Sequence, residues 1–301
     1  MMKTCWNRLR YLLVASAALG LGGCDWVLFD SMGAVGIAQR DLIIVSTALM
    51  LIVVVPAIVM SFAFAWRFRA SNRHARYTPD WAHSTRIEVV VWGVPLVIVA
   101  ILAVIVWRST HELDPYKPLD VPGEPLHIEV VATDWKWLFI YPDQGIATIN
   151  QLHFPVGRQL VFDITSNSTM NTFFIPQLGG QIYAMAGMRT KLHLIADAPG
   201  QFRGISGNYS GRGFSRMNFT ATATSDAGFA DWGAQVRQAP PTLDFDTFRQ
   251  VAQPSEGHPV THFASVQPGL FKRVIDQFTG VGENTRPAAT PPHSQHQIPE
   301  E

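Results

Sequence analysis

Cysteine is scarce in this sequence, with Cys5 and Cys24 as the two examples among 301 residues. Charge is scarce too: 15% of the residues are charged, against about 25% in typical soluble domains. The formal net charge is zero, and there is no basic stripe outside one short loop, which excludes a typical nucleic-acid-binding protein. The apolar residues gather in three runs before residue 108. This pattern indicates a membrane protein with an attached globular domain.

Residue groups typical of catalytic centres are also missing. The sequence has no Gly-rich phosphate loop, no nucleophile elbow and no carboxylate pair that suggests a catalytic cleft. His127, His153 and His193 fall on different expected strands without a His, Cys or Met partner at ligand spacing. We interpret them as surface or strand histidines. His293 and His296 lie in a polar C-terminal tail and would bind metal weakly.

The first apolar run has the features of a lipoprotein signal. The run, residues 11–19, is too short to span a bilayer. A basic start precedes it, made of Lys3, Arg8 and Arg10. It ends in Leu-Gly-Gly followed by Cys24, the pattern read by lipoprotein-processing enzymes. The alternative is an ordinary signal whose cleavage site happens to neighbour a cysteine.

We therefore predict that residues 1–23 form a signal peptide and that Cys24 becomes the lipidated N-terminus of the mature chain. Residues 24–41 would follow as a periplasmic N-terminal segment. Because Cys5 would leave with the signal, the mature chain would hold one cysteine. That excludes an intrachain disulfide and a cysteine-based metal site.

Two longer apolar runs predict membrane-spanning helices. Residues 42–66 and residues 89–107 contain no charged side chain, and each run is long enough to cross about 30 Å of hydrocarbon as a helix. Pro56 and Pro95 interrupt them, which membrane helices tolerate. We predict transmembrane helices over 42–66 and 87–107.

The loop between these helices, residues 67–86, indicates the topology. It has one acid, Asp80, against five basic residues: Arg67, Arg69, Arg73, Arg76 and Arg86. By the positive-inside rule this loop is cytoplasmic, and the signal independently exports the N-terminus. We therefore expect a multi-pass protein of the bacterial inner membrane with its N-terminus and its C-terminal domain in the periplasm.

A proline-rich linker, residues 108–125, is followed by β-type sequence. Alternating segments predict strands over 126–132, 135–141, 159–165, 190–196 and 217–223. Short strands separated by turn residues favour a β sandwich or barrel, which we place at residues 126–226. The fold class is therefore a two-helix transmembrane hairpin followed by an all-β domain.

The sequence after this domain changes to an aromatic-rich pattern. Phe245, Phe248 and Val251 have the spacing of one helical face. We predict a small helical segment over residues 227–279 rather than more sheet. Residues 280–301 are rich in Pro, Gln, Thr and His, a composition that predicts disorder.

Motifs in the β domain resemble the copper domain of subunit II of haem-copper oxidases. They are residues 134–137 with Tyr141-Pro142, residues 168–176 with 183–188, and residues 204–217. The forms with these side chains resemble subunit II of the bo-type ubiquinol oxidases. The lipoprotein signal, the two spans and the aromatic-rich C-terminal segment also match that family, over about residues 20–280. The resemblance implies a cupredoxin-like sandwich.

Departures from the cytochrome c oxidase pattern concern the copper ligands. That pattern has a His and then Cys-x-Glu-x-Cys-x3-His-x2-Met, which bind two coppers. The corresponding residues are Asn171, Ser206, Asn208, Ser210, Phe214 and Met217, so only the methionine remains. Hydroxyl, amide and phenyl groups do not replace thiolates and imidazoles as copper ligands. We therefore expect no metal or other cofactor bound by this chain.

The resemblance implies a non-catalytic subunit II of a proton-pumping ubiquinol oxidase, a ubiquinol:oxygen oxidoreductase of the aerobic respiratory chain. Haems and one copper are then expected in a partner, subunit I, accompanied by smaller membrane subunits. Ubiquinol dissolves in the bilayer and reaches that subunit without an external copper relay. Without copper, Trp135 and Trp137 are expected to pack in the core rather than to admit electrons. The alternative is a membrane-anchored cupredoxin-like lipoprotein, a binding module outside respiration.

Glu88 is the acid that adjoins the second span on the cytoplasmic side. One interpretation is a carboxylate in the first turn of a helix, which suits the helix dipole. The other comes from the resemblance, since haem-copper oxidases carry a Glu before the Trp of this span, here Trp92. In that family it lies at the mouth of a proton-uptake channel.

Overall fold

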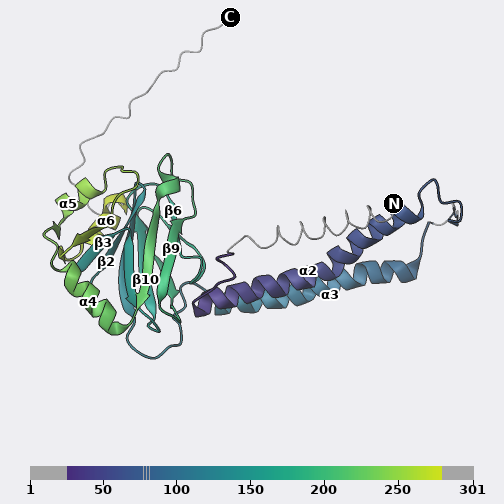
Figure 1. Ribbon diagram of the computed structural model, residues 1–301, viewed down its shortest axis with the longest axis horizontal. Helices are drawn as coiled ribbons and strands as arrows, with labels where there is room; N and C mark the ends of the chain where they lie inside the picture. Colours follow the sequence, from purple (N-terminus) through teal and green to yellow (C-terminus); the bar gives the residue numbers. More distant parts are fainter. Residues whose placement is uncertain (1–25, 77, 79, 81, 280–301) are drawn as a thin grey trace, which may run out of the picture.

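The computed structural model describes residues 26–279 except 77, 79 and 81. Within this part of the chain, a long helical hairpin adjoins a β sandwich at one end (Figure 1). The predicted signal peptide, the predicted lipidation site Cys24 and the predicted disordered tail lie outside the described residues.

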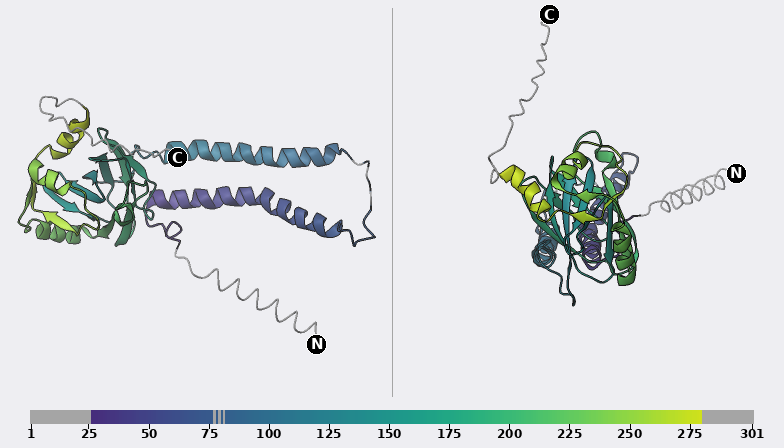
Figure 2. Two further views of the ribbon diagram at one scale, coloured as in Figure 1. Left: turned by 90° about the horizontal axis from the view of Figure 1, so that it is seen from above. Right: turned by 90° about the vertical axis from the view of Figure 1, so that its left-hand side faces the viewer.

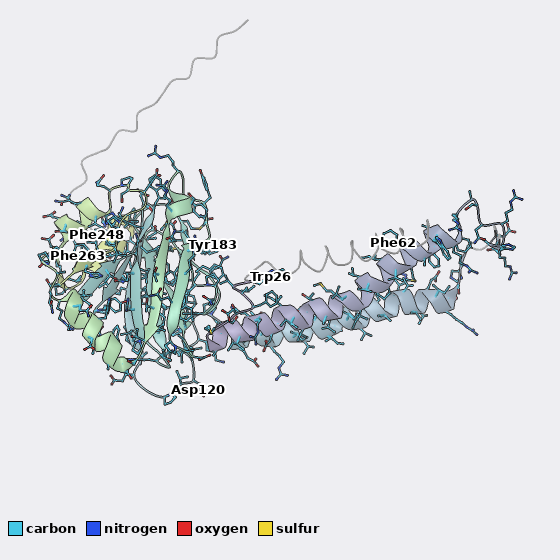
Figure 3. All side chains as sticks on the ribbon, in the orientation of Figure 1. Trp26, Phe62, Asp120, Tyr183, Phe248 and Phe263 are labelled. Carbon is cyan, nitrogen blue, oxygen red and sulfur yellow. The ribbon has the colours of Figure 1, made fainter. Side chains whose placement is uncertain are left out.

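Two long apolar helices form the hairpin, α2 (Ala34–Arg67) and α3 (Thr85–Glu112). Both are long and apolar enough to cross a membrane. Their apolar side chains point outward, as Phe62 does (Figure 3), which is the arrangement expected of helices surrounded by lipid or by other membrane helices. Helix α2 bends along its length (Figure 2), and Pro56 within it explains a bend, because proline removes a helix hydrogen bond.

The start of α2 is attached to the sandwich by direct backbone contacts. The N–H of Met32 donates to the carbonyl of Gln177 at 2.8 Å, and the N–H of Gly36 donates to the carbonyl of Leu178 at 3.0 Å. A Cβ at Gly36 would lie 2.9 Å from the carbonyl oxygen of Gln177. The helix approaches this closely because residue 36 has no side chain.

The β domain consists of two packed sheets. The six-stranded sheet has the order β12-β3-β2-β1-β5-β8, and the five-stranded sheet has the order β4-β10-β9-β6-β7. The first contains β1 (Leu126–Thr133), β2 (Lys136–Tyr141), β3 (Ile146–Ile149), β5 (Leu160–Ser166), β8 (Thr190–Leu194) and β12 (Thr261–Phe263). The second contains β4 (Gln151–Pro155), β6 (Asn171–Phe174), β7 (Ile182–Ala184), β9 (Gly200–Ser206) and β10 (Asn218–Thr224).

The predicted sandwich is confirmed. The five strands predicted from alternation correspond to β1, β2, β5, β8 and β10, with ends that differ by at most two residues. Strands β1 and β5 pair in parallel, as do β4 and β10, so the chain crosses between the sheets rather than forming simple hairpins throughout.

The six-stranded sheet is covered on both faces. Its inner face packs on the five-stranded sheet around residues such as Trp137, Phe139 and Phe173. Its outer face packs on the C-terminal segment through Leu138 and Ile140. Every residue of β2 is therefore buried, which explains why residues 137–141 are all apolar and depart from the alternation expected of this segment.

The C-terminal segment is mainly helical, as predicted. Its helices are α4 (Asp226–Val236), α5 (Phe245–Val251) and α6 (Leu270–Thr279). Phe248 of α5 is buried in the outer core, and Figure 3 places it beside Phe263, on the side of the sandwich away from the hairpin.

The prediction that this segment adds no sheet was wrong. It contains the short strands β11 (Thr242–Leu243), β12 and β13 (Ser265–Val266). Strand β12 pairs with β3 and extends the six-stranded sheet. Three paired residues are too few for an alternating pattern to be recognised in a sequence.

Candidate functional site

The six positions that correspond to copper ligands in the resembling family lie on two strands of the five-stranded sheet, β6 and β9, and in the loop that follows β9. Asn171 begins β6, and Ser206 ends β9. The remaining four follow β9 in the chain, in the loop that includes the 3-10 helix η1 (Phe214–Arg216) and leads into β10. They are Asn208, Ser210, Phe214 and Met217.

Hydrogen bonds bring the first members of this group together. The Ser206 hydroxyl donates to Asn171 Oδ1 at 3.2 Å, and the Ser206 N–H donates to the carbonyl of Met217 at 3.2 Å. Asn208 Nδ2 donates to the carbonyl of Met170, at 2.9 Å. Asn171, Ser206 and Met217 are all buried. Asn171, Ser206 and Asn208 thus bond to one another or to the backbone, whereas the buried Oγ of Ser210 has no hydrogen-bond partner among the described residues.

The side chains of this cluster are poorly suited to bind copper. The cluster offers two amides, two hydroxyls and one thioether, which is a weak ligand set for copper compared with thiolates and imidazoles. Phe214 does not contribute a donor; its ring packs edge-on against Tyr209, with ring centroids 5.7 Å apart. Among the residues that the structure describes, no group of three or more His, Cys, Asp or Glu side chains is arranged to hold a metal ion.

The β1–β2 turn covers the loop of this cluster. Trp135 adopts a left-handed conformation with φ of 65°, and its indole Nε1 donates to the carbonyl of Ser210 at 3.0 Å. The ring is half-buried against Gly211 and Gly213. Trp137 is fully buried between the sheets. Both indoles therefore occupy packing positions in the described structure.

Lys136, between these two tryptophans, has a structural role that the sequence did not suggest. Its side chain is 1% exposed. The ammonium Nζ donates to the carbonyls of Asp134 and Gln253 at 3.2 and 2.8 Å, and to Ser255 Oγ at 2.8 Å. Burial lowers the pKa of Lys136, while the nearby Asp134 charge opposes the shift. These bonds join the β1–β2 turn to the C-terminal segment.

The three histidines considered from the sequence are not brought together. His127 and His193 lie in one row of the six-stranded sheet, but Val161 stands between them. His193 is buried, and its Nδ1 lies 2.8 Å from the carbonyl oxygen of Pro115. His153 lies on the other sheet and stacks on Trp232, where burial lowers its pKa to about 4. Each ring thus has a separate structural environment.

Glu88 lies in the first turn of α3, at the hairpin end far from the sandwich (Figure 1). Its Oε2 is 3.0 Å from His83 Nε2, and both side chains are largely exposed. Trp92, one turn further along the helix, is also exposed. The carboxylate is therefore accessible to water and lies beside a titratable side chain, that of His83.

Comparisons with known proteins identify the family. The model of the COX Aromatic Rich Motif matches residues 237–282. The chain is 58% identical to subunit 2 of the cytochrome bo(3) ubiquinol oxidase of Pseudomonas aeruginosa over 91% of its own length and 83% of the relative. It is 52% identical to ubiquinol oxidase subunit 2 of Acetobacter aceti, covering 87% and 86% of the two chains.

A solved structure is similar to the β domain. The periplasmic domain of subunit II of cytochrome oxidase from Bradyrhizobium japonicum matches with 23% identity and a TM-score of 0.37, covering 38% of this chain and 95% of that domain. Together the relatives in the preceding comparisons favour an oxidase subunit over a binding module outside respiration. The chain belongs to the family of subunit 2 of ubiquinol oxidases of the cytochrome bo(3) type.

Proposed function

We propose that this chain is the copper-free, non-catalytic subunit of a proton-pumping ubiquinol oxidase and serves to assemble and cover the redox subunit. The observation that carries this proposal is the cluster around Asn171 and Ser206. Asn171, Ser206 and Asn208 bond to one another or to the backbone, and none of the six positions holds a thiolate or an imidazole. A domain of this composition supplies a protein surface rather than an electron relay.

The redox chemistry then belongs to a partner, subunit I, with its haems and one copper. Ubiquinol is apolar and dissolves in the bilayer, so it reaches a membrane-embedded site without a relay on the periplasmic surface. Each ubiquinol is oxidised to ubiquinone and releases two electrons and two protons. Two ubiquinols thus reduce one oxygen molecule to two waters, and the four protons that this reduction consumes are taken up from the cytoplasm. Further, smaller membrane subunits would complete the complex.

Contact with the partner would involve the hairpin. Along α2 and α3, large apolar side chains such as Phe62, Trp92 and Leu96 are exposed in the single chain. Within a bilayer, close packing and lipid contact both suit such surfaces. The sandwich, which is attached directly to the start of α2, would then lie over the outer face of the redox subunit.

We infer the orientation of the subunit in the membrane from the arginines of the hairpin turn and from the predicted signal peptide. The arginines of residues 67–86 would keep the hairpin turn in the cytoplasm, with the sandwich in the periplasm of the inner membrane. Cys24 would carry a diacylglycerol and an amide-linked acyl chain such as palmitate. Two spans already anchor the protein, so Cys24→Ala should leave it in the membrane. Mass spectrometry of the mature wild-type chain tests the lipidation itself, and an unmodified Cys24 would contradict it.

Purification of the complex tests the main proposal. A tag on this chain should isolate a membrane complex with haem spectra and quinol oxidase turnover, and metal analysis should find copper in the partner and none in this chain. Deleting the gene should abolish assembly or activity. A stable, fully active oxidase that lacks the chain would overturn the proposal, as would stoichiometric copper in the chain.

Glu88 is proposed to lie at the entrance of a proton-uptake path into the partner. Its support is the exposed carboxylate beside His83, at the start of α3, which the proposed orientation places at the cytoplasmic side. A surface carboxylate exchanges protons with water and passes them to a neighbouring path.

A further inference from the structure

Three of the nine methionines of the chain lie on one uncharged stretch of the β domain, residues 164–188. Met170 precedes β6, and Met185 and Met188 follow β7. The stretch contains no charged side chain, no histidine and no cysteine. The three methionines are separate from the positions that correspond to copper ligands, and the proposed function gives them no role.

Strand pairing places Met170 beside Met185. Asn171 of β6 pairs with Ala184 of β7 in an antiparallel register, and both residues are fully buried on the inner face of the sheet. Because side chains alternate between the two faces, the adjoining residues Met170 and Met185 point to the outer face. They are therefore cross-strand neighbours, and the Cβ atoms of such pairs lie about 5 Å apart.

A tight turn brings Met188 to the same place. The N–H of Met188 donates to the carbonyl of Met185 at 3.3 Å, and Gly187, the third residue of this four-residue turn, has a φ of 76°. The Cα atoms at the two ends of a β-turn lie within about 7 Å of each other. Methionine has three rotatable bonds beyond its Cα, so the three thioethers can meet at one point above the sheet edge.

Packing does not account for these side chains, although the backbone that carries them is held. Thr165 Oγ1 donates to the carbonyl of Met185 at 3.2 Å. Met170 and Met188 are 41% and 51% exposed. Met217, by contrast, is buried and belongs to the core of the sandwich, which is the usual position of a methionine.

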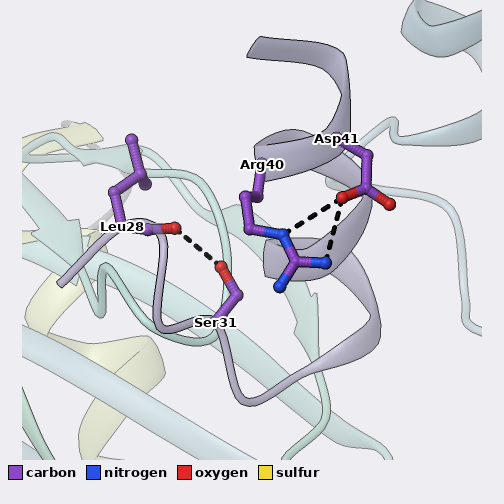
Figure 4. A network of polar contacts seen from close by, with 4 residues as sticks. All are labelled: Leu28, Ser31, Arg40 and Asp41. Atoms are coloured by element: carbon purple, nitrogen blue, oxygen red, sulfur yellow. Dashed lines mark hydrogen bonds and ion pairs between the residues drawn. The ribbon is translucent and has the colours of Figure 1, made fainter. Parts of the chain in front are cut away.

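Thioethers without a carboxylate among them select a soft cation. Sulfur ligands favour Cu(I), whereas Mg²⁺, Ca²⁺ and Mn²⁺ prefer carboxylate and carbonyl oxygens. Arg189 follows Met188 in the chain, and its Nε donates to Asp163 of the six-stranded sheet at 2.7 Å, which neutralises the guanidinium. Asp41 at the start of the hairpin is likewise bound by Arg40, at 3.1 and 3.0 Å (Figure 4). The methionines thus form a neutral group of soft ligands.

We propose that Met170, Met185 and Met188 bind one Cu(I) ion in an exchangeable site and hold it beside the redox subunit, which needs one copper. Figure 3 shows Tyr183 of β7, two residues before Met185, on the side of the sandwich toward the hairpin, where the partner would lie. The role in copper supply rests on the proposed function, whereas the binding of Cu(I) does not. Neutral thioethers hold copper less tightly than thiolates, so the complex as isolated carries no copper in this chain.

Titration of the full chain in detergent tests the binding. Cu(I) is added without oxygen in competition with the chromogenic chelator bicinchoninate, and the wild type should bind one ion per chain. Each change of Met170, Met185 or Met188 to Leu should weaken binding by about tenfold, the effect of about 1.4 kcal/mol for one lost ligand. Leucine has nearly the volume of methionine and no sulfur, so the fold should be kept. X-ray absorption of the bound copper should show sulfur neighbours.

Two other methionines serve as controls. Met50→Leu changes an exposed methionine of the hairpin and should bind Cu(I) as the wild type does. Met217→Leu changes the methionine that remains of the copper-ligand pattern, and it should also leave the Cu(I) affinity unchanged.

Growth at limiting copper tests the supply role. A site on the same assembly raises the local concentration of copper beside the partner. The complex that contains the triple Leu variant should therefore have a lower copper-to-haem ratio than the wild type when copper is limiting, and the same ratio when copper is plentiful.

Four outcomes would overturn the proposal. They are an unchanged Cu(I) affinity in the triple variant, an equal loss of affinity in either control, an absence of sulfur neighbours, and a wild-type copper-to-haem ratio for the triple variant at limiting copper. A wild-type complex without haem or quinol oxidase turnover at plentiful copper would instead contradict the proposed function, so the two failures are distinguished.

Discussion

The indole Nε1 of Trp135 donates to the carbonyl of Ser210 at 3.0 Å across 75 positions of the sequence. The β1–β2 turn and the loop after β9 are thus joined at the cluster that replaces the copper ligands. A Cβ at Gly213 would lie 2.3 Å from Cδ2 of the same indole. Glycine is required at 213 because the ring occupies the space that a side chain would need.

Gly213→Ala should therefore displace Trp135 and destabilise the chain by about 1–3 kcal/mol, as overpacking usually does. Trp135→Phe keeps a ring but removes the hydrogen bond, and it should cost about 1 kcal/mol. Quinol oxidase turnover of the assembled complex should be unchanged by Trp135→Phe, because the indole packs the loop and transfers no electrons. Gly200→Ala, where a Cβ meets only ordinary contacts, is the control in denaturant unfolding. A large fall in turnover with Trp135→Phe would argue for an electron-entry role.

Restoring the copper ligands should create a copper site. Asn171 and Ser206 already touch, and the backbone of Met217 bonds to that of Ser206. The five changes are Asn171→His, Ser206→Cys, Asn208→Glu, Ser210→Cys and Phe214→His. Thiolates and imidazoles bind copper strongly, so the purified variant should hold copper stoichiometrically and show a visible absorption band.

The same variant with Ser210 left unchanged is the control for this experiment, because it lacks one of the two thiolates and should lose the colour. Metal analysis and absorption spectra provide the measurements. Copper bound in stoichiometric amount by the unchanged chain would contradict our interpretation of the cluster.

A carboxyl on the outer face of the six-stranded sheet should make stability depend on pH. Glu129 on β1 pairs in register with Asp163 on β5, and Arg189 Nε donates to Asp163 at 2.7 Å. Burial raises the pKa of Glu129 from 4.5 to about 7; the charge of Asp163 adds to the shift and Arg189 opposes it. Between these two values the folded chain binds more protons than the unfolded chain. Its stability therefore falls as the pH rises from about 4.5 to about 7.

Glu129→Gln removes this titration because glutamine stays neutral. The variant should match the wild type near pH 5 and exceed it near pH 8 by about 1 kcal/mol, once solvent screening of the partly exposed carboxyl is allowed for. Denaturant unfolding of the full chain at the two pH values measures the difference. An equal effect of the substitution at both values would show that the carboxyl does not titrate in this range.

Strands rich in β-branched and aromatic residues were predicted from the sequence. Strands β2 and β5 are two of them, and every residue of both is buried. Strand β12 was missed because its partner β3 lies more than a hundred residues earlier. The buried position of Lys136 was not predicted either, because the carbonyl of Gln253 and the hydroxyl of Ser255 that bind its ammonium come from a distant segment. Such contacts depend on tertiary structure, which no local pattern records.

Hydropathy could not predict the junction of α2 with the sandwich, because this junction also depends on tertiary contacts. Hydropathy reports transfer into lipid, and the run without charge begins at residue 42. The helix itself begins at Ala34 because its first turn contacts protein, through bonds such as that from Gly36 to Leu178. The positions that correspond to copper ligands, by contrast, were named from motif resemblance. The structure adds that Asn171 and Ser206 are in direct contact.

The two possible roles of Glu88, a proton entrance and a favourable helix start, predict different effects of substitution on turnover. A carboxylate in the first turn of α3 suits the helix dipole, and Gln there would cost a few tenths to about 1 kcal/mol of stability without affecting turnover. A proton entrance needs an exchangeable proton. Glu88→Gln should then slow oxygen reduction by about threefold to tenfold, well below the ~10²–10⁴-fold effect of a group at the reacting atoms, because water partly replaces a surface group.

Two further variants complete this test. Glu88→Asp keeps an exchangeable proton and should retain part of the rate, and His83→Gln removes the partner 3.0 Å away and should have a smaller effect than Glu88→Gln. Haem content and complex assembly should be unchanged in all three, and Glu124→Gln in the linker is the control acid. Oxygen consumption with a soluble quinol measures the rates. If Glu88→Gln turns over as fast as the wild type, the carboxylate only completes the start of the helix.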